Sequence, residues 1–274
     1  MKRFFLCLVA LLALTACERK TAADVGKEKN KGIAITSNDE VTILEMPEGT
    51  LPKGSVKIET EPGDICPTQH PKYRLVPIFK VNYNKHNTRY VGNLSYLTNN
   101  SYDYDYNLDI NRKKEGNNWH GNIVAGFNTV YGDGLVNIAV INVETKQQKL
   151  LFEKPTFIEN LYYPTEENDT LNFKPVTRNY YMISCYDEDT NNDGYLNRND
   201  LRHFYLYSLE GNKLKQLIPN GYGVIGSSYD GANDALYIYA RQDTNQNGKI
   251  EVNEPRHIFL TDLKTPENTV LLYK

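Results

Sequence analysis

Two polar segments of equal length constrain this chain more than any other feature. DTNNDGYLNRND, residues 189–200, and DTNQNGKIEVNE, residues 243–254, begin 54 residues apart. When each is extended by three residues to end in Arg-His, the two are identical at seven of fifteen positions. RHFYLYSLEGNKLKQLI, from Arg202, and RHIFLTDLKTPENTVLL, from Arg256, each read as a strand, a polar turn and a second strand. The chain therefore contains an internal repeat, and its fold has to accommodate at least two similar units.

The same strand, turn and strand pattern occurs upstream. VNIAVINVETKQQKLLF follows it from Val136, and PIFKVNYNKHNTRYVGNL follows it more faintly from Pro77. In ALYIYAR, residues 235–241, tyrosines alternate with aliphatic residues, which places the two kinds on opposite faces of a strand. Segments with helical spacing are rare. The sequence therefore predicts an all-β fold.

The repeat also resembles a known family. Repeats of about 40 to 55 residues with about four strands are typical of propeller blades. SSYDGANDALYIYARQD, followed by RHIFLTDLKTPENTVLL, resembles the blade repeat of TolB-type periplasmic propellers, and the resemblance covers residues 125–274. It departs from the family pattern at Tyr229, where proline is usual. It implies a propeller-like domain over 36–274 with four to five blades, possibly an incomplete ring; a different all-β repeat is the alternative.

Both polar segments resemble EF-hand calcium loops. Oxygen-bearing side chains recur at positions 1, 3, 5, 9 and 12, and glycine stands at position 6, because a hard cation needs six to eight oxygens gathered inside a tight turn. Two calcium ions are therefore expected, although an ordinary solvated turn rich in Asp and Asn is the alternative. The expected donors are Asp189, Asn191, Asp193, the Tyr195 carbonyl, Asn197 and Asp200 in one segment, and Asp243, Asn245, Asn247, the Lys249 carbonyl, Glu251 and Glu254 in the other.

The residues that flank these segments favour strands over helices. YYMISCYDE and DALYIYARQ lead in, and RHFYLYSL and RHIFLTDL lead out, all rich in aromatic and β-branched residues. Calcium is then expected to order the end of a hairpin, with a dissociation constant of about 10⁻⁵ to 10⁻³ M. An EF-hand-type sensor, in which helices change their angle, is the alternative.

The first residues read as an export signal. Residues 1–16 combine a basic start with an apolar stretch too short to span a membrane. Leu14-Thr15-Ala16-Cys17 resembles the bacterial lipobox, which implies acylation of Cys17 with palmitate-type chains and anchoring in the lipid bilayer of the cell envelope, on its periplasmic face or at the cell surface. Ordinary secretion with an incidental cysteine is the alternative. Residues 18–32 are charged and nearly devoid of large apolar groups, which predicts a flexible tether over residues 17–35.

Charge and cysteine content narrow the possible partners. The chain has 31 Lys and Arg against 34 Asp and Glu and no strongly basic segment, so nucleic acid is not an expected partner. Cys66 and Cys185 remain for the folded domain. Sequence alone leaves open whether they form a disulfide or two buried free thiols.

No catalytic motif emerges from the sequence. His203 and His257 occupy equivalent repeat positions, which favours a structural role for them in bracing the polar segments. Tyrosines at 102, 104 and 106, and Trp119, are candidate contacts for a protein or glycan; the alternatives are an outer strand whose tyrosines cover a neighbour, and a plug formed by Trp119. The expected function is a binding or scaffold module rather than an enzyme. The alternative is an enzyme of cell-envelope polysaccharide metabolism whose site lies in the mouth of a propeller.

Overall fold

The computed structural model describes residues 32–37, 40–47, 49–54, 57–91, 94–97, 124–166 and 169–274. Within these residues there are twenty-two strands and no helix, so the all-β prediction is confirmed. The described part accordingly holds no helix long and apolar enough to cross a membrane. Cys17, the tyrosines at 102–106 and Trp119 lie outside the described residues.

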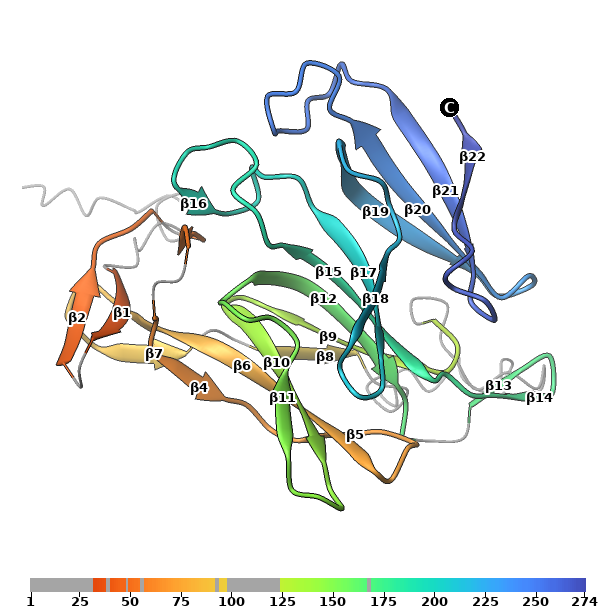
Figure 1. Ribbon diagram of the computed structural model, residues 1–274, viewed down its shortest axis with the longest axis horizontal. Helices are drawn as coiled ribbons and strands as arrows, with labels where there is room; N and C mark the ends of the chain where they lie inside the picture. Colours follow the sequence, from red (N-terminus) through yellow and green to blue (C-terminus); the bar gives the residue numbers. More distant parts are fainter. Residues whose placement is uncertain are drawn as a thin grey trace, which may run out of the picture.

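Three large antiparallel sheets make up the fold (Figure 1). The first sheet has the order β11-β10-β6-β1-β2, with β4, β5 and β7 also paired to β6. Its strands are β1 (Gly32–Ser37), β2 (Glu40–Leu44), β4 (Thr60–Pro62), β5 (Cys66–Pro67), β6 (Tyr73–Tyr83), β7 (Arg89–Val91), β10 (Leu135–Asn142) and β11 (Gln148–Leu150).

The middle and last sheets follow along the chain. The middle sheet has the order β18-β17-β15-β12-β9-β8 and the last sheet β19-β20-β21-β22. Their strands are β8 (Leu94–Leu97), β9 (Phe127–Gly132), β12 (Phe157–Pro164), β15 (Tyr180–Tyr186), β17 (His203–Ser208), β18 (Lys213–Gln216), β19 (Tyr222–Asp230), β20 (Ala235–Gln242), β21 (Arg256–Asp262) and β22 (Val270–Tyr273). Two small ribbons pair β13 (Asp169–Leu171) with β14 (Lys174–Val176), and β3 (Leu51–Pro52) with β16 (Tyr195–Leu196).

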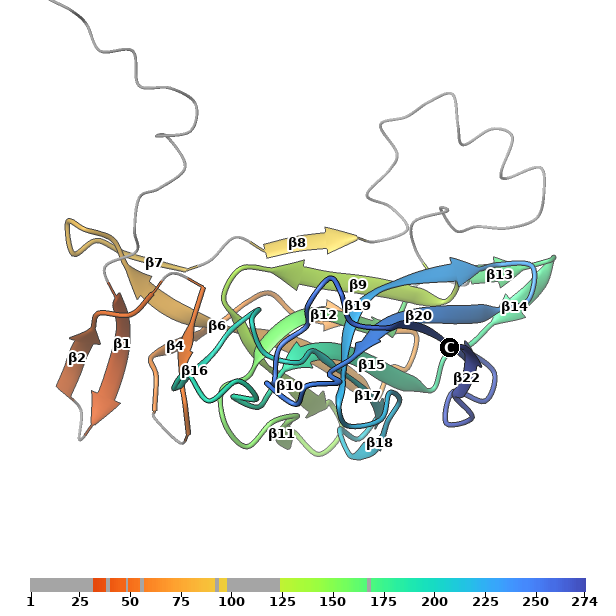
Figure 2. The same ribbon diagram turned by 90° about the horizontal axis from the view of Figure 1, so that it is seen from above.

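The middle sheet is covered on both faces. Tyr181 and Ile183 of β15 belong to a core cluster with Leu75 of the first sheet, whereas Met182 belongs to a cluster with Ile238 of the last sheet. Every residue of β15 is buried. A strand buried on both faces reads as a continuous apolar run, whereas one covered on a single face alternates, as β20 does. The sequence pattern of a strand thus indicates whether its sheet is covered on one face or on both. Figures 1 and 2 place β1 and β2 at the opposite end of the molecule from β22.

The internal repeat forms two similar four-stranded units. The strands β12-β15-β17-β18 and β19-β20-β21-β22 each run antiparallel in chain order. Cys185 pairs with His203 in the first unit and Ala240 pairs with His257 in the second, so the units correspond strand by strand, with one additional residue before the first polar segment. The middle sheet, however, continues past β12 into β9 and β8. The predicted count of four to five blades is therefore not confirmed.

Two further sequence expectations can be settled. β1 begins at Gly32, inside residues 17–35. Its Ile33 pairs with Asn82 of β6 and is only 3% exposed. β1 thus begins four residues before the predicted boundary at 36, because GIAITS pairs with β2 and β6. The thiols of Cys66 and Cys185 are both buried, and no disulfide joins them. Burial raises the pKa of the Cys185 thiol well above its usual value, which makes it unreactive.

Candidate metal centre

The two polar segments are hairpin loops at neighbouring ends of the middle and last sheets. Loop 1 (residues 189–200) connects β15 to β17, and loop 2 (residues 243–254) connects β20 to β21 (Figure 1). Both are therefore flanked by strands, as the sequence predicts, and neither lies between helices. The loops also touch: the Thr190 hydroxyl donates to the Gly248 carbonyl at 2.7 Å.

The aspartate at position 1 organises each loop in the same way. Its two carboxylate oxygens accept hydrogen bonds from the backbone N–H groups at positions 5 and 6, which curl the chain around it. The bonds run to Asp189 from Asp193 (3.0 Å) and Gly194 (3.1 Å), and to Asp243 from Asn247 (3.1 Å) and Gly248 (2.9 Å).

The acidic residue at position 12 closes each loop from the other side. One of its oxygens accepts the N–H of position 2 and the other accepts the N–H of position 9, so the first and last residues of the loop are tied together. The bonds run to Asp200 from Thr190 (3.0 Å) and Asn197 (2.9 Å), and to Glu254 from Thr244 (3.0 Å) and Glu251 (2.9 Å).

Backbone geometry repeats as well. Positions 4 and 6 have positive φ in both loops: Asn192 (57°) and Gly194 (90°), and Gln246 (55°) and Gly248 (73°). Asparagine and glycine tolerate this region better than most residues. Two segments that differ at eight of fifteen positions thus close in the same way, which indicates that Asp at position 1, Asn at position 3, Gly at position 6 and an acidic residue at position 12 determine the loop conformation.

The predicted donors are gathered in these loops, but their acidic side chains do not form a metal-sized cluster. In the described part of the chain, no three or more His, Cys, Asp or Glu side chains lie close enough together to hold a metal ion. The carboxylates accept backbone N–H groups instead. Each carboxylate has about four lone-pair sites, so these bonds leave acceptor capacity for a cation. The donor chemistry therefore fits calcium, while the binding of two ions remains a prediction.

Loop 1 carries a cation of its own. The Lys53 ammonium lies 3.0 Å from the second oxygen of Asp189, and the Lys53 backbone N–H donates to the Gly194 carbonyl at 3.1 Å. Burial raises the pKa of Asp189, but Lys53 and the N–H groups of Gly194 and Asp193 lower it by more, so the net shift is downward. Lys53 is held there by β3, which pairs with β16 inside loop 1. Among the described residues, no ion pair reaches Asp243 of loop 2.

The two repeat histidines are buried beside their loops. The Asp187 carboxylate bonds the His203 ring at 2.6 Å and accepts the Tyr205 hydroxyl at 2.8 Å, two residues before loop 1. Burial raises the pKa of Asp187, but His203 and Tyr205 lower it by more. His257 bonds the Tyr222 hydroxyl at 2.9 Å. Both histidines face the preceding sheet and contact residues outside the loops, so the predicted bracing role remains a prediction.

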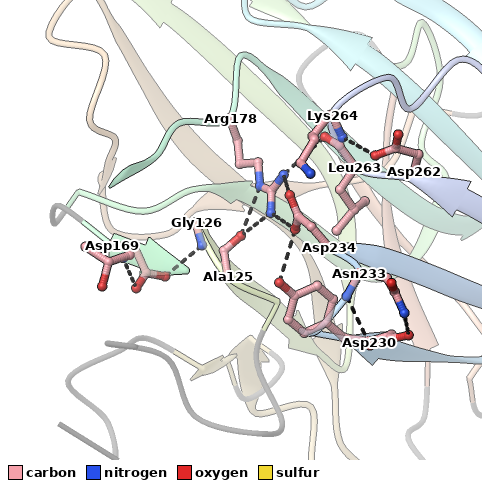
Figure 3. Close-up of polar contacts among 12 residues, drawn as sticks. Ala125, Gly126, Asp169, Arg178, Asp230, Asn233, Asp234, Asp262, Leu263 and Lys264 are labelled. Atoms are coloured by element: carbon pink, nitrogen blue, oxygen red, sulfur yellow. Dashed lines mark hydrogen bonds and ion pairs between the residues drawn. The ribbon is translucent and has the colours of Figure 1, made fainter. Parts of the chain in front are cut away.

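A buried arginine that the sequence did not single out ties the sheets together (Figure 3). Arg178 donates to both Asp234 oxygens at 2.6 and 3.1 Å, and to two backbone carbonyls, those of Ala125 and Leu263. Its side chain is 2% exposed. It lines a cavity of about 640 Å³ that is also lined by Lys174 and Lys264. Because its donors are used within the protein, Arg178 is a structural residue.

Comparisons with known proteins identify no family for this chain. No protein-family model and no curated protein matches the chain. Among solved structures, the crystal structure of the tricorn protease is similar with a TM-score of 0.23 and 9% sequence identity, over 80% of this chain and 27% of that chain. This chain thus spans about a quarter of the length of that protein. A similarity this low carries no argument about fold or activity.

Proposed function

We propose that this chain is a lipid-anchored, calcium-binding protein of the bacterial cell envelope. In this proposal Cys17 carries the acyl chains, and a propeller-like domain acts as a binding or scaffold module for a protein or glycan. Calcium has a structural role, in that it orders the ends of two hairpins. The observation that carries the proposal is the identical hydrogen-bond scheme of loops 1 and 2.

Charge explains why a metal would matter. Each loop holds three carboxylates within twelve residues: Asp189, Asp193 and Asp200 in loop 1, and Asp243, Glu251 and Glu254 in loop 2. Three like charges on one short loop disfavour its compact form unless a cation offsets them. Because the loops touch through Thr190 and Gly248, ordering one of them also supports the other.

Calcium should raise the stability of the protein measurably. For a dissociation constant of 10⁻⁴ M, about 10 mM calcium stabilises the folded state by ~2.7 kcal/mol per site. Thermal unfolding in calcium and in chelator measures this, with magnesium as the competing ion. Asp243→Asn should reduce the shift, whereas Asp64→Asn, at an exposed position outside both loops, should leave it unchanged. Superimposed melts in calcium and chelator would rule out a structural metal.

Lys53 should lower the calcium affinity of loop 1. Its ammonium lies where it competes with a divalent ion for Asp189, so Lys53→Met should tighten calcium binding by roughly 1.5- to 5-fold, the range for a partly exposed ion pair. Loop 2 should keep its affinity. Lys57→Met, on the same N-terminal segment but without an ion pair to either loop, is the matched control for a calorimetric titration. Equal affinities in the two variants would show that Lys53 does not compete.

A further inference from the structure

The last sheet presents an apolar face that no other described element covers. Tyr237 and Tyr239 of β20, and Ile258 and Leu260 of β21, point away from the middle sheet and are half-buried, while Val270 of β22 is 52% exposed. The contacts these side chains make lie within the sheet. Tyr237 donates to Asp230, Tyr239 bonds Ser228, and Arg256 stacks on Tyr239. In Figure 1 this sheet is the outermost layer at the upper right.

In the first repeat unit, the face equivalent to this one is buried. When the units are superposed on the pairs Cys185–His203 and Ala240–His257, four residues of the middle sheet correspond to the four just named on β20 and β21. These counterparts are at most 4% exposed, because the last sheet lies over their face of the middle sheet. They are Met182, Ser184, Phe204 and Leu206. The equivalent face of the last sheet is therefore also apolar, as a buried face is, but no described element packs against it.

Charges are arranged on this face so that it complements itself. Arg241 and Arg256 are paired neighbours in one row across the strands. Asp230 and Asp262 both pair with Ala235, in another row. The two rows are six residues apart, about 20 Å along the strands, with the tyrosine and aliphatic rows between them. Consider a two-fold axis that lies in the interface, perpendicular to the strands and midway between the two rows. It places Arg256 of each copy over Asp262 of the other copy.

We propose that this face is the interface of a homodimer, with a second copy of the chain as its occupant. In this arrangement Tyr237 lies over Tyr239 and Ile258 over Leu260 of the other copy, at the spacing of about 10 Å that two packed sheets adopt. The interface is isologous, as closed dimers require. The proposal stands independently of calcium.

Charge reversal tests this pairing directly on the purified protein. By sedimentation equilibrium the unaltered protein should dimerise at micromolar concentration. Arg256→Asp and Asp262→Arg should each weaken dimerisation by about 100-fold or more, because like charges then meet at both ends of the interface. An equimolar mixture of the two variants should form a heterodimer, since every Asp then meets an Arg. The double variant R256D/D262R should dimerise as the unaltered protein does.

Controls separate the interface from folding and from other surfaces. Circular dichroism melts identify a variant that fails to fold. In that case Ile258→Glu, which changes the centre of the face, replaces the charge variants. Leu214→Glu, on exposed β18 of the middle sheet, should leave the dimer intact. A monomer at 100 µM, or a dimer that survives each single reversal unchanged, overturns the proposal; a monomer would leave another segment or partner as the cover.

Discussion

Replacing Arg178 with alanine should lower the free energy of unfolding by about 3 to 5 kcal/mol, the range for removing one partner of a buried ion pair. The Arg178 and Asp234 side chains are 2% and 6% exposed. Without the guanidinium, Asp234 keeps the Tyr229 hydroxyl and the Leu263 carbonyl keeps the Tyr180 hydroxyl, but the Ala125 carbonyl loses both of its Arg178 N–H donors. Urea unfolding monitored by tyrosine fluorescence measures the loss.

Arg198 provides the matched control for this prediction. It also pairs with a carboxylate, Glu159, at 3.0 Å, but its side chain is 58% exposed. Arg198→Ala should cost about 1 kcal/mol or less, since exposed ion pairs contribute little and its stacking on Phe157 is the main loss. Arg178→Lys should fall between the two, because one ammonium cannot serve four separated oxygens. Similar losses for Arg178→Ala and Arg198→Ala would show that burial adds nothing to the Arg178 pair.

The local parts of this fold could be predicted because their causes are local. Alternation in residues 235–241 gives the face of β20 that meets the core, and the turn residues between 208 and 213 give the β17 to β18 hairpin. The loop conformation also follows from sequence, since Asp189 and Asp243 bond residues four and five positions ahead. Periodicity, turns and loop closure all act over a few residues.

The long-range parts could not be predicted for the same reason. β9 and β10 are consecutive in the chain, yet β9 joins the middle sheet and β10 joins β6 of the first. The partners of Arg178 lie 53 to 85 residues away along the chain, and Lys53 pairs with Asp189, 136 residues after it. Nothing in the residues near Arg178 or Lys53 identifies those partners. The position of Arg178 beside the apolar run YYMISCY indicates that its charge is buried, but it does not identify the residue that pairs with it.

Alanine at Gly248 should destabilise the protein far more than alanine at Gly194, although both residues occupy position 6 of their loops. Positive φ alone costs an alanine about 1 to 2 kcal/mol at either position. At Gly194 a Cβ atom would meet nothing within 4 Å. At Gly248 it would lie 2.0 Å from the Thr190 carbonyl oxygen, so the two loops have to separate. We expect an additional loss of ~2 to 3 kcal/mol for Gly248→Ala.

A double-mutant cycle then decides whether the loops act as one unit. Thr190→Ala removes the hydroxyl that joins the loops, which also accepts from Leu201 at 2.8 Å. If Gly248→Ala has already parted the loops, Thr190→Ala should cost at least about 0.5 kcal/mol less in that background than alone. In the Gly194→Ala background its cost should be unchanged. Additive losses in both backgrounds would mean that the loops are independent, and that ordering one loop does not support its neighbour.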